Sequence, residues 1–141
     1  MVVDAREVTV TPNFRLVACF FALCTAQVYG EKLALVIGIA GYPGFPAGEN
    51  LKFAGRDAAE FARFIQSAQG GSFSPDNVHL VTNGDANRVR VYDEFTWLYK
   101  IAGPDDLVYV FFAGHGVEFR NVLYLLPYDA LKRSPDSLGI R

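Results

Sequence analysis

The residue best suited to chemistry in this sequence is His115, which lies between Gly114 and Gly116 directly after an apolar run. An imidazole can take up and release a proton near neutral pH, so it can act as a general base or acid. Glycine on both sides allows the backbone to turn sharply and is expected to leave the ring uncovered. The alternative is a turn histidine without a chemical role. The second histidine, His79, is expected to be a strand side chain with a local partner and no chemistry.

The place of His115 in the chain favours the chemical interpretation. Residues 107–112 are six consecutive apolar residues, rich in β-branched and aromatic types, which is typical of a strand buried on both faces of a parallel sheet. Reaction sites in open α/β sheets lie at the carboxyl ends of the strands, which is where His115 falls. Asp57 is expected in the first turn of a helix that begins at that same end. Its alternative role is a favourable interaction with the helix N-terminus.

The elements that must hold these residues alternate between strands and helices. Apolar runs predict strands at residues 33–39, 78–82, 107–112 and 122–126. Helical spacing of apolar residues predicts one helix from about Gly55 to Ala68. A second is expected to begin after Asn87, a suitable N-cap, and to reach about Ala102. This alternation predicts right-handed crossovers and a parallel sheet with helices on its faces.

The segment 38–50 contains four glycines and two prolines and predicts a loop at the carboxyl end of the first strand. Its glycines raise the alternative of a nucleotide-binding loop. However, the spacing G-x-x-G-x-x-G differs from the G-x-G-x-x-G fingerprint. Pro43 and Pro46 would also obstruct a helix that began there. The loop is therefore not expected to bind a nucleotide cofactor.

The first thirty residues differ from the rest of the chain. Residues 16–26 are strongly apolar and follow Arg15, but they are fewer than the roughly 20 apolar residues of a transmembrane helix. Their length fits the core of a signal peptide, and residues 24–26 supply a cleavage site of small residues. We therefore expect a leader over residues 1–30 and a secreted or periplasmic protein, which meets a membrane only if the leader is retained. The alternatives are a membrane anchor and a buried first strand, and without a signal the protein would be cytoplasmic.

Charge and cysteine content limit the functional classes. The 141 residues include 13 Lys plus Arg and 15 Asp plus Glu, a net charge of −2, which argues against a nucleic-acid partner bound by bulk positive charge. Hydrophobic residues make up 51% of the chain, enough for the ordered core of one domain. Both cysteines, Cys19 and Cys24, lie in the leader. Removal of the leader would exclude disulfides and a cysteine-based metal site.

Four stretches of the chain together resemble one family. They are LALVIG from Leu33, LKFAGRDAAEFARFI from Leu51, GPDDLVYVFFAGHG from Gly103 and YLLPYDA from Tyr124. In this order and at these spacings they resemble the caspase-like cysteine peptidases, in particular the bacterial metacaspase-like branch, over residues 32 to about 130. The resemblance implies a three-layer α/β caspase-like fold with a parallel sheet, a protein or peptide substrate and no cofactor.

The resemblance also implies roles for three residues. His115 matches the catalytic histidine that partners a cysteine nucleophile, and Gly116 matches the glycine whose backbone N–H lines the oxyanion hole. Asp57 matches the acidic residue of the S1 pocket in metacaspase-type members, which selects Arg or Lys at the cleaved bond. The chemistry is coherent, because an imidazole can convert a thiol to a thiolate and N–H donors stabilise the developing oxyanion.

Two departures from the family pattern shape the expected function. Ala113 replaces a serine that often precedes the Gly-His-Gly sequence, and no cysteine follows Cys24. We therefore expect residues 31–141 to be the N-terminal part of a caspase-like catalytic domain, incomplete at the C-terminus and inactive by itself. The acidic insertion of calcium-dependent members is not recognisable, so no metal is expected. The alternatives are a non-catalytic caspase-like interaction module and an unrelated flavodoxin-like binding domain.

Overall fold

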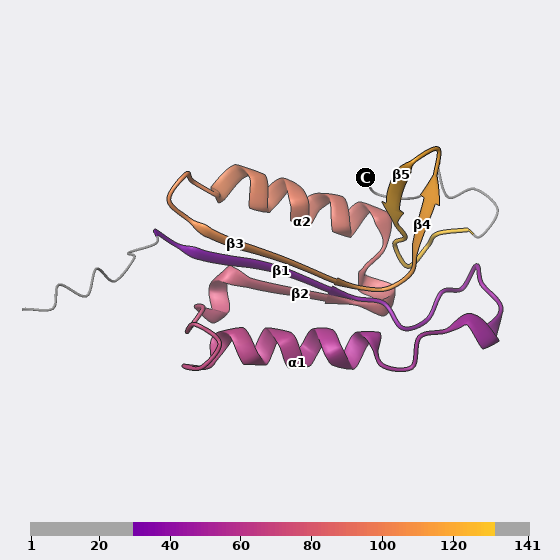
Figure 1. Ribbon diagram of the computed structural model, residues 1–141, viewed down its shortest axis with the longest axis horizontal. Helices are drawn as coiled ribbons and strands as arrows, with labels where there is room; N and C mark the ends of the chain where they lie inside the picture. The colour runs from indigo at the N-terminus through magenta and orange to yellow at the C-terminus, as the bar shows by residue number, and fades with distance from the viewer. Residues whose placement is uncertain (1–29, 132–141) are drawn as a thin grey trace, which may run out of the picture.

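The computed structural model describes residues 30–131, so all of the expected leader except Gly30 lies outside the described residues. A three-stranded parallel sheet lies between two helices, with α1 on one face and α2 on the other (Figure 1). The strand order is β2-β1-β3. The bounds are β1 (Lys32–Gly38), α1 (Ala54–Gln66), β2 (Val78–Thr82), α2 (Arg88–Ile101) and β3 (Leu107–Ala113). The expected three-layer α/β architecture is confirmed.

The central strand β1 explains why the sheet is covered on both faces. Side chains alternate between the two faces of a strand, and β1 is apolar at every position after Lys32. Leu33, Leu35 and Ile37 belong to a buried cluster that includes residues of α2. Ala34 and Val36 belong to a second cluster that includes residues of α1. One apolar run thus builds two cores.

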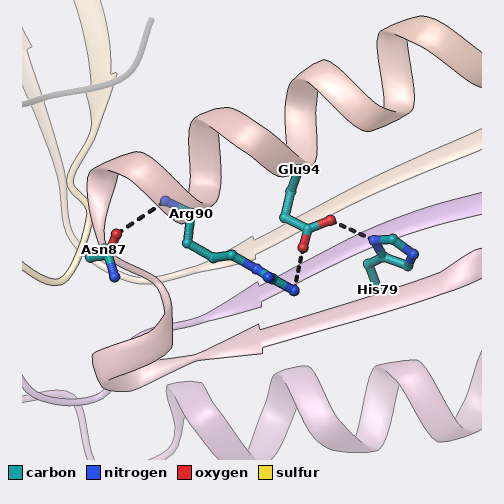
Figure 2. Close-up of polar contacts among 4 residues, drawn as sticks. All are labelled: His79, Asn87, Arg90 and Glu94. Carbon is teal, nitrogen blue, oxygen red and sulfur yellow. Dashed lines mark hydrogen bonds and ion pairs between the residues drawn. The ribbon is translucent and has the colours of Figure 1, made fainter.

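Both helices lie close to their expected ranges. Asn87 caps α2 as expected, since its Oδ1 accepts a hydrogen bond of 3.0 Å from the Arg90 N–H (Figure 2). Helix α1 ends two residues before the expected Ala68, because Ser67 adopts an extended conformation and its hydroxyl donates to the Phe64 carbonyl at 2.6 Å. Within residues 30–131, no helix is long and apolar enough to cross a bilayer.

The expectation that residues 107–112 are buried on both faces is wrong. Strand β3 pairs with β1 alone among the described residues and forms an edge of the sheet. Val108, Tyr109 and Val110 are 38%, 38% and 50% exposed. An apolar composition favours packing of a strand against other residues, but it does not show whether those residues lie nearby in the sequence.

The expected strand at residues 122–126 is present but does not join the parallel sheet. Strand β5 (Val122–Leu125) pairs antiparallel with β4 (Gly116–Phe119), a strand that the sequence pattern did not predict. Arg120 and Asn121 connect them with φ of 51° and 60°, the left-handed pair of a two-residue hairpin turn. The hairpin follows β3 directly and lies beyond the carboxyl end of the sheet, on the side of α2 (Figure 1).

At the opposite end of the sheet, one carboxylate accepts hydrogen bonds from two separate segments of the backbone. Asp106, just before β3, accepts hydrogen bonds of 2.7 Å from the N–H of Gly103 and of Glu31. These two donors, Gly103 first, lower the pKa of Asp106 below its ordinary value of 3.8. The contact joins the entry into β1 to the entry into β3.

Candidate active site

His115 lies at the carboxyl end of the sheet, as expected. Gly38 and Ala113 are paired at the ends of β1 and β3, and His115 follows two residues later. The expectation that flanking glycines leave its ring uncovered is wrong. The ring stacks on Phe45 at 5.3 Å between centroids and lies 4.9 Å from the ring of Tyr42. These contacts leave the imidazole only partly exposed.

A backbone carbonyl holds the imidazole in one orientation. Nε2 of His115 lies 2.7 Å from the carbonyl oxygen of Glu49, in the short 3-10 helix Ala47–Glu49. Because a carbonyl oxygen only accepts hydrogen bonds, Nε2 must carry a proton when it makes this contact. In the neutral ring, Nδ1 therefore keeps its lone pair and is the nitrogen able to accept a proton. The arrangement suits His115 to act as a base through Nδ1.

A cavity of about 250 Å³ opens beside the imidazole. Most of its lining side chains are apolar, which favours contact with an uncharged part of a substrate. The lining residues are Phe45, Glu49, His115, Gly116, Val117, Leu126 and Leu131.

Gly116 contributes a backbone donor beside the histidine. In the β4–β5 ladder Gly116 faces Leu125, whereas the neighbouring Leu126 N–H donates to the His115 carbonyl at 2.9 Å. Hydrogen-bonded and non-bonded pairs alternate along an antiparallel ladder, so the Gly116 N–H points away from β5. A Cβ on Gly116 would meet no atom closer than 3.5 Å. Packing of the described residues therefore does not itself require glycine at this position.

Asp57 lies at the same end of the sheet but outside this cavity. It is in the first turn of α1, whose Ala54 and Ala58 pack against Gly38 at the end of β1. Its side chain is 50% exposed, and Oδ1 lies 3.8 Å from an Arg56 nitrogen. Helix α1 covers one face of the sheet, whereas His115 packs with the cluster on the other face. The structure thus brings His115 and Gly116 together and leaves Asp57 apart from both.

The β1–α1 loop supplies a part of the site that the sequence pattern did not predict. Tyr42 is 3% exposed, and burial raises the pKa of its hydroxyl to about 12. Tyr42, Phe45 and the Glu49 carbonyl are the groups that contact His115 from this loop. The feature of the sequence that could have indicated these residues was the position of their loop at the carboxyl end of a strand. The contribution of Glu49 is a backbone carbonyl, which side-chain chemistry cannot reveal.

The second histidine belongs to a separate cluster (Figure 2). The ring of His79 in β2 stacks on that of Trp97, with 3.5 Å between the ring centroids. Nδ1 of His79 lies 2.5 Å from Oε2 of Glu94 in α2. The expected partner exists, but it comes from another element and is not local. Among residues 30–131, no group of three or more His, Cys, Asp or Glu is placed to hold a metal ion.

The fold and the site together define a class of protein. A three-layer α/β domain carries a histidine on a Gly-His-Gly turn at the carboxyl end of its sheet, as in a caspase-type hydrolase. The family model for the caspase domain of peptidase family C14 matches residues 31–136, so the chain belongs to this family. Membership indicates a peptidase-type function with protein or peptide substrates. No curated protein matches the chain significantly.

Proposed function

We propose that this chain is the histidine-bearing part of a cysteine endopeptidase that cleaves after Arg or Lys. The observation that carries the proposal is the anchored imidazole of His115. Its Nε2 donates to the Glu49 carbonyl, which leaves Nδ1 to act as the base, and His115 lines a cavity. A histidine held in this way needs only a thiol within reach to form a catalytic pair.

The proposed reaction assigns a step to each group. Nδ1 of His115 takes the proton of the thiol, and the thiolate attacks the scissile carbonyl to give a tetrahedral oxyanion. The outward N–H of Gly116 donates to that oxyanion, a contact of the kind that contributes about 3 kcal/mol. His115 then returns the proton to the leaving amine, and water releases the acyl group by the same route. No cofactor takes part.

Asp57 is proposed to select the basic side chain. Its half-exposed carboxylate lies at the end of the sheet that carries the site, and a guanidinium or ammonium group can pair with it. The contact with Arg56 at 3.8 Å is long and exposed, so it stabilises the pair by less than about 1 kcal/mol and yields readily to a substrate.

The nucleophile is proposed to come from outside this chain. Cys19 and Cys24 both precede β1, and no cysteine follows them. Loss of the nucleophile from a comparable triad costs about 10⁶ in turnover, so the 141-residue chain alone is expected to be inactive. The same observation favours a second candidate, a non-catalytic caspase-like module for protein interaction.

Hydrolysis of fluorogenic Arg and Lys peptides tests the proposal. The proteins compared are this chain and the product of the gene read past Arg141, each with and without His115→Ala. The chain is expected to be silent, and the extended protein active only with His115 intact. Asp57→Asn in the extended protein should reduce cleavage after Arg and Lys, whereas the exposed Asp93→Asn on α2 should not. Turnover by the chain that His115→Ala abolishes would reveal an unrecognised nucleophile. A folded but silent extended protein would favour the interaction module.

Export is a separate proposal that rests on the apolar leader. Cells that make the chain with its own N-terminus should release a product lacking Cys19 and Cys24. Mass spectrometry of the exported fraction measures this directly. Residues 1–30 intact in that fraction would contradict a cleaved signal peptide.

A further inference from the structure

The hydrogen bonding around His115 departs from that of a regular hairpin. In the register of β4 and β5, His115 and Leu126 are opposite each other and should exchange two backbone hydrogen bonds. One is present, from the Leu126 N–H to the His115 carbonyl at 2.9 Å. In place of the other, the His115 N–H donates to Oη of Tyr42 at 2.8 Å, and the Tyr42 hydroxyl donates to the Leu126 carbonyl at 3.2 Å. The tyrosine hydroxyl is thus inserted into the ladder.

We propose that Tyr42 is the positioning residue of this active site, and that its inserted hydroxyl sets the backbone of His115 so that the imidazole meets the Glu49 carbonyl. The proposal rests on the proposed function for its catalytic meaning, because His115 is the base there. Tyr42 itself touches no reacting atom. It acts through the main chain of His115 and through ring contact with Phe45, which stacks on the imidazole.

The surroundings of the hydroxyl are built for this contact. Tyr42 is 3% exposed, so water does not compete for its two hydrogen bonds. A Cβ on Gly114 would lie 2.6 Å from Oη of Tyr42 and 2.7 Å from Cζ of Phe112, so these two side chains together require glycine before His115 although its φ is not positive. Burial raises the pKa of the hydroxyl to about 12, so it stays protonated near neutral pH and remains a donor to Leu126.

Removal of the Tyr42 hydroxyl should change the tautomer of His115, which a general loss of stability would not do. Without the hydroxyl, the His115 N–H and the Leu126 carbonyl either bond directly to each other, which displaces the main chain of His115, or stay unpaired, which removes the restraint on it. The imidazole then loses its fixed distance to Glu49, and the preference for a proton on Nε2 weakens. A tyrosine that only filled the core would leave this preference unchanged when its hydroxyl alone was removed.

The test is NMR of the 141-residue chain with Tyr42→Phe, which removes the hydroxyl and keeps the ring. The chain has two histidines, and they donate through different ring nitrogens. Nε2 is protonated in His115, whereas Nδ1 is protonated in His79 because the Glu94 carboxylate accepts from it. Long-range ¹H–¹⁵N spectra distinguish the two forms. In Tyr42→Phe, His115 should shift toward a mixture of tautomers, its amide should exchange about tenfold faster, and His79 should not change.

The control is Ile65→Val, which loosens the α1 core at a residue 1% exposed and far from the hairpin. It should leave both signals of His115 as in the unaltered chain. Should Tyr42→Phe not fold, Gly114→Ala displaces the hydroxyl by its Cβ and should give the same change at His115. Because this Cβ would also lie 2.7 Å from the Phe112 ring, Phe112→Leu is its control and should leave His115 unchanged. An unchanged His115 in Tyr42→Phe, or an equal change in Ile65→Val, would overturn the proposal. Because turnover is not measured, the result is independent of the peptidase assay.

Discussion

The carboxylate of Glu94 in α2 joins that helix to the edge strand β2 through His79. Oε2 of Glu94 lies 2.5 Å from Nδ1 of His79, and Oε1 lies 2.7 Å from a guanidinium nitrogen of Arg90 (Figure 2). The Glu94 side chain is 5% exposed, whereas those of His79 and Arg90 are 32% and 59% exposed. A desolvated carboxylate is tolerated only when it is paired on both oxygens, as here.

We expect Glu94→Ala to lower the free energy of unfolding by about 2 kcal/mol, because it removes two charge-assisted hydrogen bonds and leaves a gap against the sheet. A double-mutant cycle with His79→Ala should give a coupling energy of about 1 kcal/mol. Urea unfolding followed by circular dichroism measures both. The neighbouring exposed Asp93→Ala is the control and should change stability by less than about 0.5 kcal/mol. An equal loss in both variants would mean that the cluster is not a stabilising contact.

This cluster shows where sequence reasoning reaches its limit. Val91 and Leu98 recur at helical spacing and lie on the buried face of α2. Glu94 lies on the same face, three residues from Val91 and four from Leu98. Apolar periodicity identifies only apolar positions, so it could not predict that this carboxylate is buried. Only the packing of α2 on β2 brings His79 to it. The element was predictable, whereas the polar contact that crosses to another element was not.

The candidate site was likewise predictable only in part. The position of His115 after a strand's carboxyl end followed from sequence pattern, because parallel strands end together. Its tautomer did not, because it depends on a carbonyl of Glu49, 66 residues away in the chain. The face of the sheet on which Asp57 lies, opposite that of His115, also depends on tertiary packing. A β–α motif places both residues at one end of the sheet without fixing their separation.

Close packing of α1 on the sheet makes a second prediction. A Cβ on Gly38 would lie 2.5 Å from Cβ of Ala58 and 2.7 Å from the Ala54 carbonyl oxygen. Because backbone cannot yield cheaply, Gly38→Ala should cost about 2 kcal/mol in the free energy of unfolding. The matched control is Gly48→Ala, where the added methyl meets nothing within 4 Å and stability should change by less than about 0.5 kcal/mol. Equal midpoints in a urea titration would contradict this packing.

A third prediction concerns acid stability. The pKa of Asp106 is lower in the folded protein than its ordinary 3.8, so its contribution to stability is present when the pH is well above 3.8. The contribution declines as the pH falls below 3.8 and is lost once the pH passes the folded value. Urea midpoints measured between about pH 2 and pH 7 should therefore fall less steeply at the acid end in Asp106→Asn than in the unaltered chain. Parallel curves would mean that the carboxylate gains nothing from the Gly103 and Glu31 donors.

The edge formed by β3 makes the last prediction. Its outer backbone groups have no strand beside them among residues 30–131, and Val108, Tyr109 and Val110 are partly exposed. An apolar open edge is a template for pairing with another chain, so this chain should self-associate through β3. Val110→Lys should slow the growth of light scattering on concentration, because a charge on an edge strand opposes such pairing.

The control for this prediction is Val89→Lys on α2. Val89 is 70% exposed, against 50% for Val110, so both lysines can reach solvent. Each substitution changes the net charge from −2 to −1, so a general effect of charge on solubility would be the same in both. The apolar residues 16–26 are also common to both variants. Slower association in Val110→Lys alone would assign the contact to the β3 edge, whereas equal rates would place it elsewhere in the chain.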